Sequence, residues 1–439
     1  MKRTFALAFA LAAFAAPVFA SGAVPDDPFL LSNRKIYIRF FEYRDAGSPR
    51  LFRESAAELL ERAANGDPLS MFIAAISADD PGAPCPLGID SETRKRYLET
   101  SRARIEGIAE KNGNPLAQYL LGLADGDTAK LETAADNGNS QARIRLALGL
   151  LNSALHESDS SKKLADEKKA MDLLSKAASF PAGNKINPDA SPCALNMLGR
   201  CYEKGRGRNM KNGKPDADFR YAFRAYSQAA KAGHPDALHN LSRLKYSGLG
   251  CKKNLAESLE AERAAAEAGH PDAMACYGSI LESGMTGTNG ATLVVAQPGA
   301  GREMIERSAR EGSKIGAHLY GRILRDSGDP SRKAEALEFL DKAARAGIVE
   351  AQFETATILL ENESADPGDE IRAARYLSMA AAKGHAGAMS ALSSCYETGR
   401  GIQKSKRKAT LWMMRARAAR GDIAAAGWLV KHKDGVDRD

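Results

Sequence analysis

The 439-residue sequence lacks the features that mark several classes of protein. It has six cysteines but no Cys-x-x-Cys pair, so neither a zinc ribbon nor a redox dithiol is indicated. Beyond the first twenty residues, no run of about 18 apolar residues could span a bilayer. The net charge of +7 is a mild excess and far from that of a nucleic-acid-binding tail. With 44% apolar residues, the composition excludes a disordered or collagen-like chain and predicts a sizeable core.

The first twenty residues have the pattern of a secretory signal peptide. Lys2 and Arg3 precede an apolar run that ends in the small-residue cleavage pattern of residues 18–20. We predict a mature chain that begins at Ser21 and is periplasmic or secreted. No cysteine lies at the cleavage point, so we expect no lipid anchor there. All six cysteines would lie in an oxidising compartment, where disulfides can persist.

One sequence pattern recurs from residue 66 to the C-terminus. A small-residue helix end is followed by a glycine, two or three turn residues, and an apolar helix that opens with a small residue, here called the anchor. The last anchors are 35 to 37 residues apart, whereas earlier intervals vary from 25 to 52. The anchors are Ala117, Ala142, Ala194, Ala237, Ala273, Gly316, Ala351, Ala388 and Ala425.

Two positions around the anchor predict how the helices end and pack. Glycine lies four residues before eight of the nine anchors, which fits a helix C′ position with positive φ, and Ala190 is the exception. Five residues after the anchor, eight of nine positions hold Gly, Ala or Ser, and Val430 is the exception. We therefore expect helix backbones to approach closely at these small residues.

Each period has room for two helices. Residues 221–233 and 236–248 both carry apolar side chains three and four apart and lack internal proline. A lone helical hairpin cannot cover its apolar face, so neighbouring hairpins must stack. The sequence thus predicts an all-α solenoid of αα-hairpins.

Long segments between the expected helices are predicted to be surface loops. The sequence TLVVAQ in the last of them fits either a short strand or a segment tucked into the array. Residues 35–44 fit a strand or a capping helix equally, because their apolar residues follow neither period cleanly. The predicted loops are residues 78–90, 156–166, 180–191, 205–216 and 285–299.

The repeats resemble the Sel-one-like repeat (SLR) family of the tetratricopeptide-like superfamily. The family pattern of Leu-Gly, Tyr and Gly-x-Gly is matched in full by one copy: Leu198, Gly199, Tyr202, Gly205 and Gly207. The resemblance implies a right-handed superhelix. We expect a signal peptide at 1–20, an N-terminal capping segment at 21–50, the repeat solenoid at 51–433, and a disordered tail at 434–439.

The resemblance implies binding rather than a reaction. Such proteins usually work as scaffolds that bind a protein or peptide along the concave groove, and many bacterial members are exported. We therefore expect a non-enzymatic exported scaffold with no catalytic, metal or cofactor site. The alternative is a cell-envelope glycan-binding factor or hydrolase, because some cysteine-rich relatives are labelled penicillin-binding proteins or β-lactamases.

The serine motif of β-lactamases is only partly present. Ser160 and Ser405 each begin a Ser-x-x-Lys sequence, but the partner motifs Ser-Asp-Asn and Lys-Thr-Gly occur nowhere in the chain. Four-residue matches arise by chance in a chain rich in Ser and Lys. Catalysis by this route is therefore disfavoured.

The cysteines give no pairing pattern. Cys193 and Cys201 have the eight-residue spacing seen in cysteine-rich relatives, but on one helix they would lie about 12 Å apart, too far for a disulfide. Cys201 and Cys395 occupy equivalent repeat positions and are interpreted as small buried apolar groups. No partner can be assigned to Cys85, Cys251 or Cys276.

Three histidines follow turn glycines, and a row of metal ligands is the alternative interpretation. His234, His270 and His385 lie at equivalent repeat positions, which are about 8–10 Å or more apart in stacked hairpins. One zinc ion cannot bind two of them, because each ligand nitrogen must lie about 2.0–2.1 Å from the metal. We expect turn and helix-start roles.

Two basic stretches contain no acidic residue. One carries the candidate partner-binding residues Arg206, Arg208, Lys211 and Lys214, and the other covers residues 400–420. Either they are solvated surfaces, with Arg417 and Arg420 suited to a helix C-terminus, or they contact an anionic envelope component or acidic protein. Nucleic acid is disfavoured because the chain carries an export signal and no known binding motif.

Overall fold

The computed structural model describes most of the repeat region. It covers residues 36–37, 39–45, 48–80, 83–178, 191–207, 210–211, 214–215, 217–287, 290–361 and 366–432. The predicted signal peptide and C-terminal tail lie outside the described residues. The chain divides into two compact units, residues 1–273 and 274–439, and each is described by itself.

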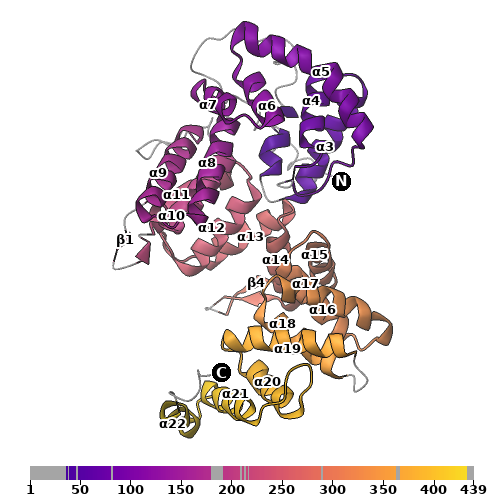
Figure 1. The fold of residues 1–439 in the computed structure, drawn as a ribbon, viewed down its shortest axis with the longest axis vertical. Helices are drawn as coiled ribbons and strands as arrows, with labels where there is room; N and C mark the ends of the chain where they lie inside the picture. Colours follow the sequence, from indigo (N-terminus) through magenta and orange to yellow (C-terminus); the bar gives the residue numbers. More distant parts are fainter. Residues whose placement is uncertain are drawn as a thin grey trace. The chain divides into compact units, whose positions relative to one another are not determined.

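The first unit is built of consecutive helices (Figure 1). Residues 36–37 and 39–44 are also helical, so the helix rather than the strand alternative is confirmed for these residues. The helices that follow are α3 (Pro49–Ala64), α4 (Pro68–Ser77), α5 (Ser91–Asn112), α6 (Pro115–Asp125), α7 (Thr128–Asp136), α8 (Ser140–His156), α9 (Ser160–Ala177), α10 (Pro192–Glu203), α11 (Phe219–Lys231), α12 (Pro235–Ser247) and α13 (Leu255–Glu267).

The second unit repeats this arrangement. The unit boundary falls within α14 (Pro271–Ser283). The helices after it are α15 (Pro298–Arg310), α16 (Lys314–Asp326), the 3₁₀ turn η1 (Pro330–Arg332), α17 (Lys333–Arg345), α18 (Val349–Glu361), α19 (Pro367–Ala382), α20 (Ala386–Thr398), α21 (Lys406–Ala419) and α22 (Ile423–Lys431).

Helices pair in the way that the anchors predict. Every anchor lies in the first turn or two of an even-numbered helix, from α6 to α22, and we call these the first helices. Within each unit a first helix packs against the odd-numbered helix that follows, as α8 does on α9 and α16 on α17, and that helix packs on the next first helix. The all-α hairpin solenoid is therefore confirmed.

The irregular anchor spacings have a simple structural cause. The 25-residue interval holds a shortened hairpin, because α7 has only nine residues. The 52-residue interval holds the longer helices α8 and α9, of 17 and 18 residues. The loop predicted at 156–166 is partly wrong: α9 begins at Ser160, because the Asp159 side chain accepts the Ser161 and Lys162 N–H groups and caps the helix there.

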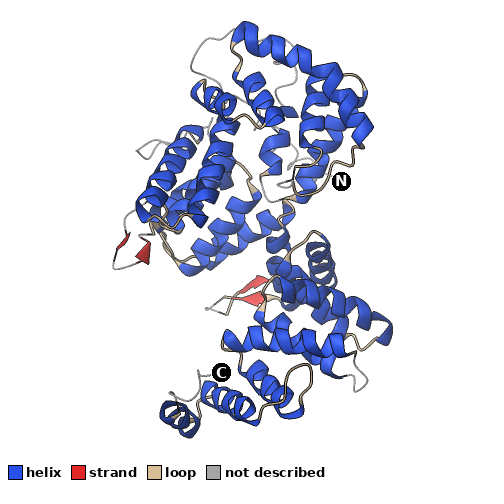
Figure 2. Ribbon diagram, in the orientation of Figure 1, coloured by secondary structure: helices blue, strands red, loops and turns tan. Residues whose placement is uncertain are grey.

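Two of the predicted loops contain short antiparallel strand pairs (Figure 2). In the loop at 205–216, β1 (Met210–Lys211) pairs with β2 (Lys214–Pro215). In the loop at 285–299, β3 (Met285–Thr286) pairs with β4 (Thr292–Val294). The TLVVAQ sequence therefore contributes a strand, which confirms one of the two alternatives.

Small residues allow the close helix packing that the sequence predicts. A Cβ atom added at Gly199 of α10 would lie 2.5 Å from the Tyr226 ring of α11, and one at Gly321 of α16 would lie 2.8 Å from Leu340 of α17. The eight glycines before the anchors all have positive φ, as the helix C′ interpretation requires. Apolar cores lie between the packed helices of each unit.

Candidate functional site

The basic loop at residues 205–216 makes contacts within the first unit through Arg206 and Gly207. Arg206 is the only one of the four candidate partner-binding residues whose side chain the structure describes. Its guanidinium lies 3.4 Å from a carboxylate oxygen of Glu167 on α9, and the Gly207 N–H donates to the same carboxylate. Arg208 lies outside the described residues, as do the side chains of Lys211 and Lys214. The Arg206 side chain therefore stabilises the packing of its loop against the neighbouring hairpin.

The two serines of the Ser-x-x-Lys motifs lie at helix starts. Ser160 is the exposed first residue of α9. Ser405 is the N-cap of α21, where its oxygen accepts the Lys408 N–H. In the second basic stretch, Arg400 and Arg417 form ion pairs with Glu370 and Asp422. Ser405, Arg400 and Arg417 therefore each have a local structural role.

The three turn histidines cap helices, as predicted. The Nδ1 atom of each histidine accepts the N–H of the anchor three residues ahead, at 3.4 Å for His234, 3.1 Å for His270 and 3.0 Å for His385. Within the described residues no group of three or more His, Cys, Asp or Glu side chains could hold a metal ion. No helix among them is long and apolar enough to cross a membrane.

Sequence reasoning missed a buried Cys–His pair. Cys193 Sγ lies 3.3 Å from His234 Nε2 and donates to the main-chain oxygen of Glu42 at 3.2 Å. Because His234 Nδ1 accepts the Ala237 N–H, the ring proton lies on Nε2, so this nitrogen cannot take a proton from the thiol. Burial raises the pKa of Cys193 well above its usual value. The pair is therefore a structural contact and not an activated nucleophile.

None of the six cysteines forms a disulfide with another residue that the structure describes. Cys193 and Cys201 both lie on α10 and do not bridge, as the spacing predicts. Cys201 and Cys395 are each 3% exposed, which confirms their interpretation as small buried groups.

Residues 39–45 and 48–50 lie across the helix ends of the first unit. Glu42 accepts hydrogen bonds from the Gln141 side chain at the start of α8 (3.1 Å) and from the Ser191 hydroxyl at the N-cap of α10 (2.8 Å). Burial raises the pKa of Glu42, and hydrogen bonds from Cys193 and Ser191 partly offset that effect. Ser48 donates to the Ala268 carbonyl at the end of α13. This face of the unit thus holds a segment of its own chain.

A fixed register along the first helices defines three open grooves. Residues 3, 6, 7 and 10 positions after the anchor line a groove whose other wall includes the preceding first helix. On α10 and its C-cap these residues are Met197, Arg200, Cys201 and Lys204; on α16 they are Leu319, Arg322, Ile323 and Asp326; on α18 they are Glu354, Thr357, Ile358 and Glu361. We call these the α8–α10, α14–α16 and α16–α18 grooves.

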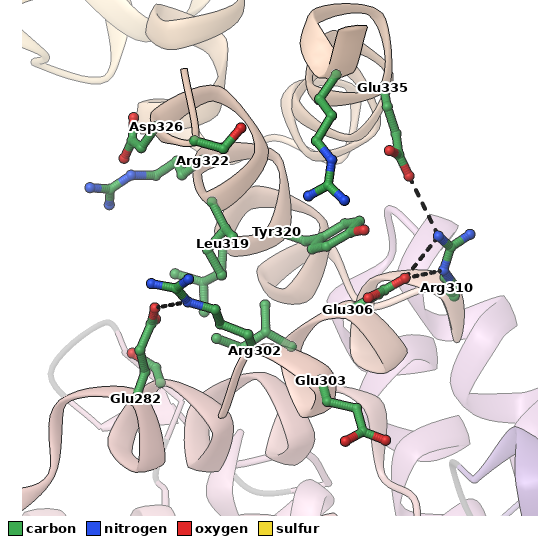
Figure 3. Close-up of a pocket in the computed structure, with 15 residues that line it drawn as sticks. Glu282, Arg302, Glu303, Glu306, Arg310, Leu319, Tyr320, Arg322, Asp326 and Glu335 are labelled. Atoms are coloured by element: carbon green, nitrogen blue, oxygen red, sulfur yellow. Dashed lines mark hydrogen bonds and ion pairs between the residues drawn. The ribbon is translucent and has the colours of Figure 1, made fainter. Parts of the chain in front are cut away.

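The α14–α16 groove is the largest, at about 830 Å³, and its charges are mostly paired among themselves (Figure 3). Arg302 points toward Glu282, with Nε 3.0 Å from the carboxylate. Arg310 lies between Glu306 and Glu335, at 2.9 and 3.5 Å. Exposed pairs of this kind leave little net charge to attract a charged ligand.

The α16–α18 groove, of about 460 Å³, has an acidic wall. Burial alone would raise the pKa of Glu354, but the His318 hydrogen bond at 3.2 Å and two nearby arginines lower it. Glu350 and Glu361 are exposed on the same helix, and the Phe353 ring lies against His385 with 4.6 Å between centroids.

The α8–α10 groove has the opposite character. It is lined by Leu148, Leu151, Asn152 and Leu155 of α8, by Met197, Arg200 and Cys201 of α10, and by Lys204 and Arg206. Its volume is about 260 Å³. The floor is apolar and the charged groups at the rim are basic.

Six segments of the chain match the family model for the Sel1 repeat: residues 140–179, 194–234, 235–270, 316–348, 349–385 and 386–419. Together they cover half of the chain. The chain belongs to the Sel1 repeat family. Sel1 repeat proteins are generally scaffolds for protein interaction, and their hairpins here are α8–α9 to α12–α13 and α16–α17 to α20–α21.

Several solved structures are similar to this Sel1 repeat chain. One is a protective antigen present in uropathogenic Escherichia coli strains that displays an SLR fold; it has 19% identity and a TM-score of 0.48, covering 94% of this chain and 85% of its own. A Sel1 repeat protein from Oxalobacter formigenes has 24% identity and a TM-score of 0.44, covering 61% and 99%. An immunity protein from Pseudomonas aeruginosa has 17% identity and a TM-score of 0.33, covering 55% and 86%. None of these likenesses indicates a shared partner.

A histidine pair within the Sel1 repeat at residues 235–270 was also missed. His239 of α12 stacks on His270 with 4.7 Å between ring centroids, and its Nδ1 lies 3.0 Å from Glu262 of α13. Burial lowers the pKa of His239, but the hydrogen bond and charge of Glu262 outweigh burial, so the pKa is raised from its usual value of 6.5. The folded state therefore favours the charged imidazole.

We expect the stabilisation from His239 to depend on pH. A histidine whose pKa is raised on folding stabilises the fold fully below pH 6.5, and this stabilisation is lost as the pH rises through the folded-state pKa. His239→Gln should cost about 1 kcal/mol at pH 5.5 and less at pH 8.5, measured by urea unfolding. The exposed His156→Gln variant is the control, and equal losses at both pH values would contradict the assignment.

Proposed function

We propose that this chain is an exported, non-enzymatic scaffold that binds a protein or peptide along its first helices. The observation that carries the proposal is the placement of residues 39–45 and 48–50 against helix ends of the first unit, where Phe40 and Phe41 are buried and the Glu42 carboxylate accepts hydrogen bonds. A surface that binds a segment of its own chain has the shape and hydrogen-bonding groups to bind a segment of another protein. The open grooves supply further contact surface with little ordering cost on binding.

Export is part of this proposal. It is supported by the basic residues Lys2 and Arg3, the apolar run after them, and the cleavage pattern before Ser21. The non-enzymatic role is supported by the local roles of Ser405 and Cys193, neither of which is arranged as an activated nucleophile.

Copurification with chemical crosslinking tests the function. The tagged protein is purified from the periplasm and the medium, and its N-terminus is sequenced, with Ser21 expected. We expect one protein partner to be recovered in a fixed molar ratio, with crosslinks concentrated on the first helices. Crosslinks spread evenly over first and second helices would contradict the proposed binding surface.

Binding to isolated cell-wall glycan is measured beside it. Retention of the protein on that glycan, with no protein partner in either fraction, would contradict the scaffold proposal and favour an envelope glycan-binding factor. A bait that has been unfolded in urea controls for adhesion to exposed apolar surface.

A further inference from the structure

The floor of the α8–α10 groove is apolar and open to solvent. Leu155 is 56% exposed near the end of α8, and Leu148, Leu151 and Met197 beside it are only half-buried. Covering such side chains yields about 25 cal/mol per Å² of apolar surface removed from water. A partner that inserts apolar side chains here is therefore favoured over a purely polar one.

The rim of the same groove is basic and unpaired. Arg200 and Lys204 are exposed on and just after α10, and neither forms an ion pair with any residue that the structure describes. Glu203, which lies between them in the sequence, forms an ion pair with Arg243, and Glu167 forms one with Arg206. The groove therefore presents two positive charges that have no ion-pair partner among the described residues, and no unpaired negative charge.

The α16–α18 groove of the second unit shows that the repeat fold does not require apolar and basic side chains at these positions. Three positions after the anchor, Met197 of α10 corresponds to Glu354 of α18. Ten positions after it, Lys204 corresponds to Glu361. The same backbone register thus carries apolar and basic groups in one groove and acidic groups in the other. Because the fold does not fix the side chains at these positions, they can determine which partner binds.

We propose that the α8–α10 groove binds a partner segment that combines apolar side chains with Asp or Glu. This rests on the proposed scaffold function and names the chemistry of one partner. The apolar side chains cover Leu151, Leu155 and Met197, and the carboxylates pair with Arg200 and Lys204. The volume of about 260 Å³ is below the 300–1,000 Å³ typical of small-molecule sites, which favours side chains of a larger partner.

Peptide display on the full mature protein tests the proposal and does not require the natural partner to be identified. A random library of 16-residue peptides is selected for binding to the folded protein. We expect enriched peptides to combine apolar residues with Asp and Glu. Enrichment of basic peptides, or of acidic peptides without apolar residues, would overturn the proposal, and the latter outcome would point to simple polyanion binding.

Variants of the α8–α10 groove test whether the selected peptides bind there. The double variant Arg200→Glu/Lys204→Glu should weaken binding at least about tenfold, because it reverses two charges at the rim. Its control is Lys231→Glu/Lys252→Glu, which makes the same charge change at exposed positions of the first unit outside the groove. Lys231 also lies in the last turn of its helix, so the control reproduces any effect of charge on the helix dipole.

Two further measurements separate binding from folding. Leu155→Ser should weaken binding about fivefold to tenfold, whereas Ile371→Ser, at a residue 60% exposed in the second unit, should not. Peptides with Lys in place of Asp and Glu should bind the doubly reversed variant better than the original protein. Peptides that bind all variants equally would overturn the groove assignment. A copurified partner whose binding is also unchanged by Arg200→Glu/Lys204→Glu would leave the scaffold function standing and reject this site.

Discussion

Replacing Phe41 with Ala is expected to lower the free energy of unfolding of the first unit by about 3–5 kcal/mol. The Phe41 ring is fully buried, and its centroid lies 5.3 Å from the Tyr37 and Phe40 rings and 5.5 Å from the Tyr119 ring of α6. Removing it leaves a cavity between a segment that precedes the repeats and the helices that it joins. Urea unfolding combined with hydrogen exchange measures the loss.

The loss should be local, because repeat arrays are stabilised by contacts between neighbours. Amide protection should fall among residues 36–142, which share one apolar core, and should be unchanged among residues 305–416, which share another. The control is Tyr246→Ala, at an aromatic residue that is 55% exposed, with an expected loss below about 1 kcal/mol. A loss that small for Phe41→Ala would show that residues 36–45 are not part of the core.

The repeat architecture could be predicted because it is encoded locally. Each helix start and end is marked within a few residues by a capping side chain, a glycine or a proline, as at His385 and Gly384 before α20. The close approach at Gly199 could also be inferred from its place relative to the anchor. Such signals depend on neighbouring residues, so one sequence contains enough information to find them.

The site could be predicted only in part, because it depends on contacts between distant residues. Glu42 and Cys193 are 151 residues apart, and nothing near either residue indicates their contact. Arg206 lies in an entirely basic stretch, yet its acidic partner Glu167 is 39 residues away on another hairpin. The groove chemistry was missed for a different reason: the positions that line it become evident only when the facing helices are placed.

Replacing Gly250 with Ala should be among the most damaging single changes in the first unit. Gly250 follows α12 and has a φ of +72°, a conformation that costs a residue with a Cβ about 1–2 kcal/mol. An added Cβ would also overlap the main-chain carbonyl of Phe219, the first residue of α11. Main-chain atoms of a packed helix cannot move aside as a flexible side chain can, so we expect a total loss of about 3–5 kcal/mol.

The Gly233→Ala variant separates the cost of the positive φ from the cost of the overlap. Gly233 has the same φ of +72°, but an added Cβ would meet no atom within 4 Å. Gly233→Ala should therefore cost only the conformational part, and the difference between the two variants, measured by urea unfolding, gives the cost of the overlap. Gly401→Ala repeats the experiment in the second unit, where the added Cβ would overlap the Glu370 carbonyl. Equal losses for Gly250→Ala and Gly233→Ala would mean that the turn after α12 can move away from α11, contrary to the close packing between successive hairpins.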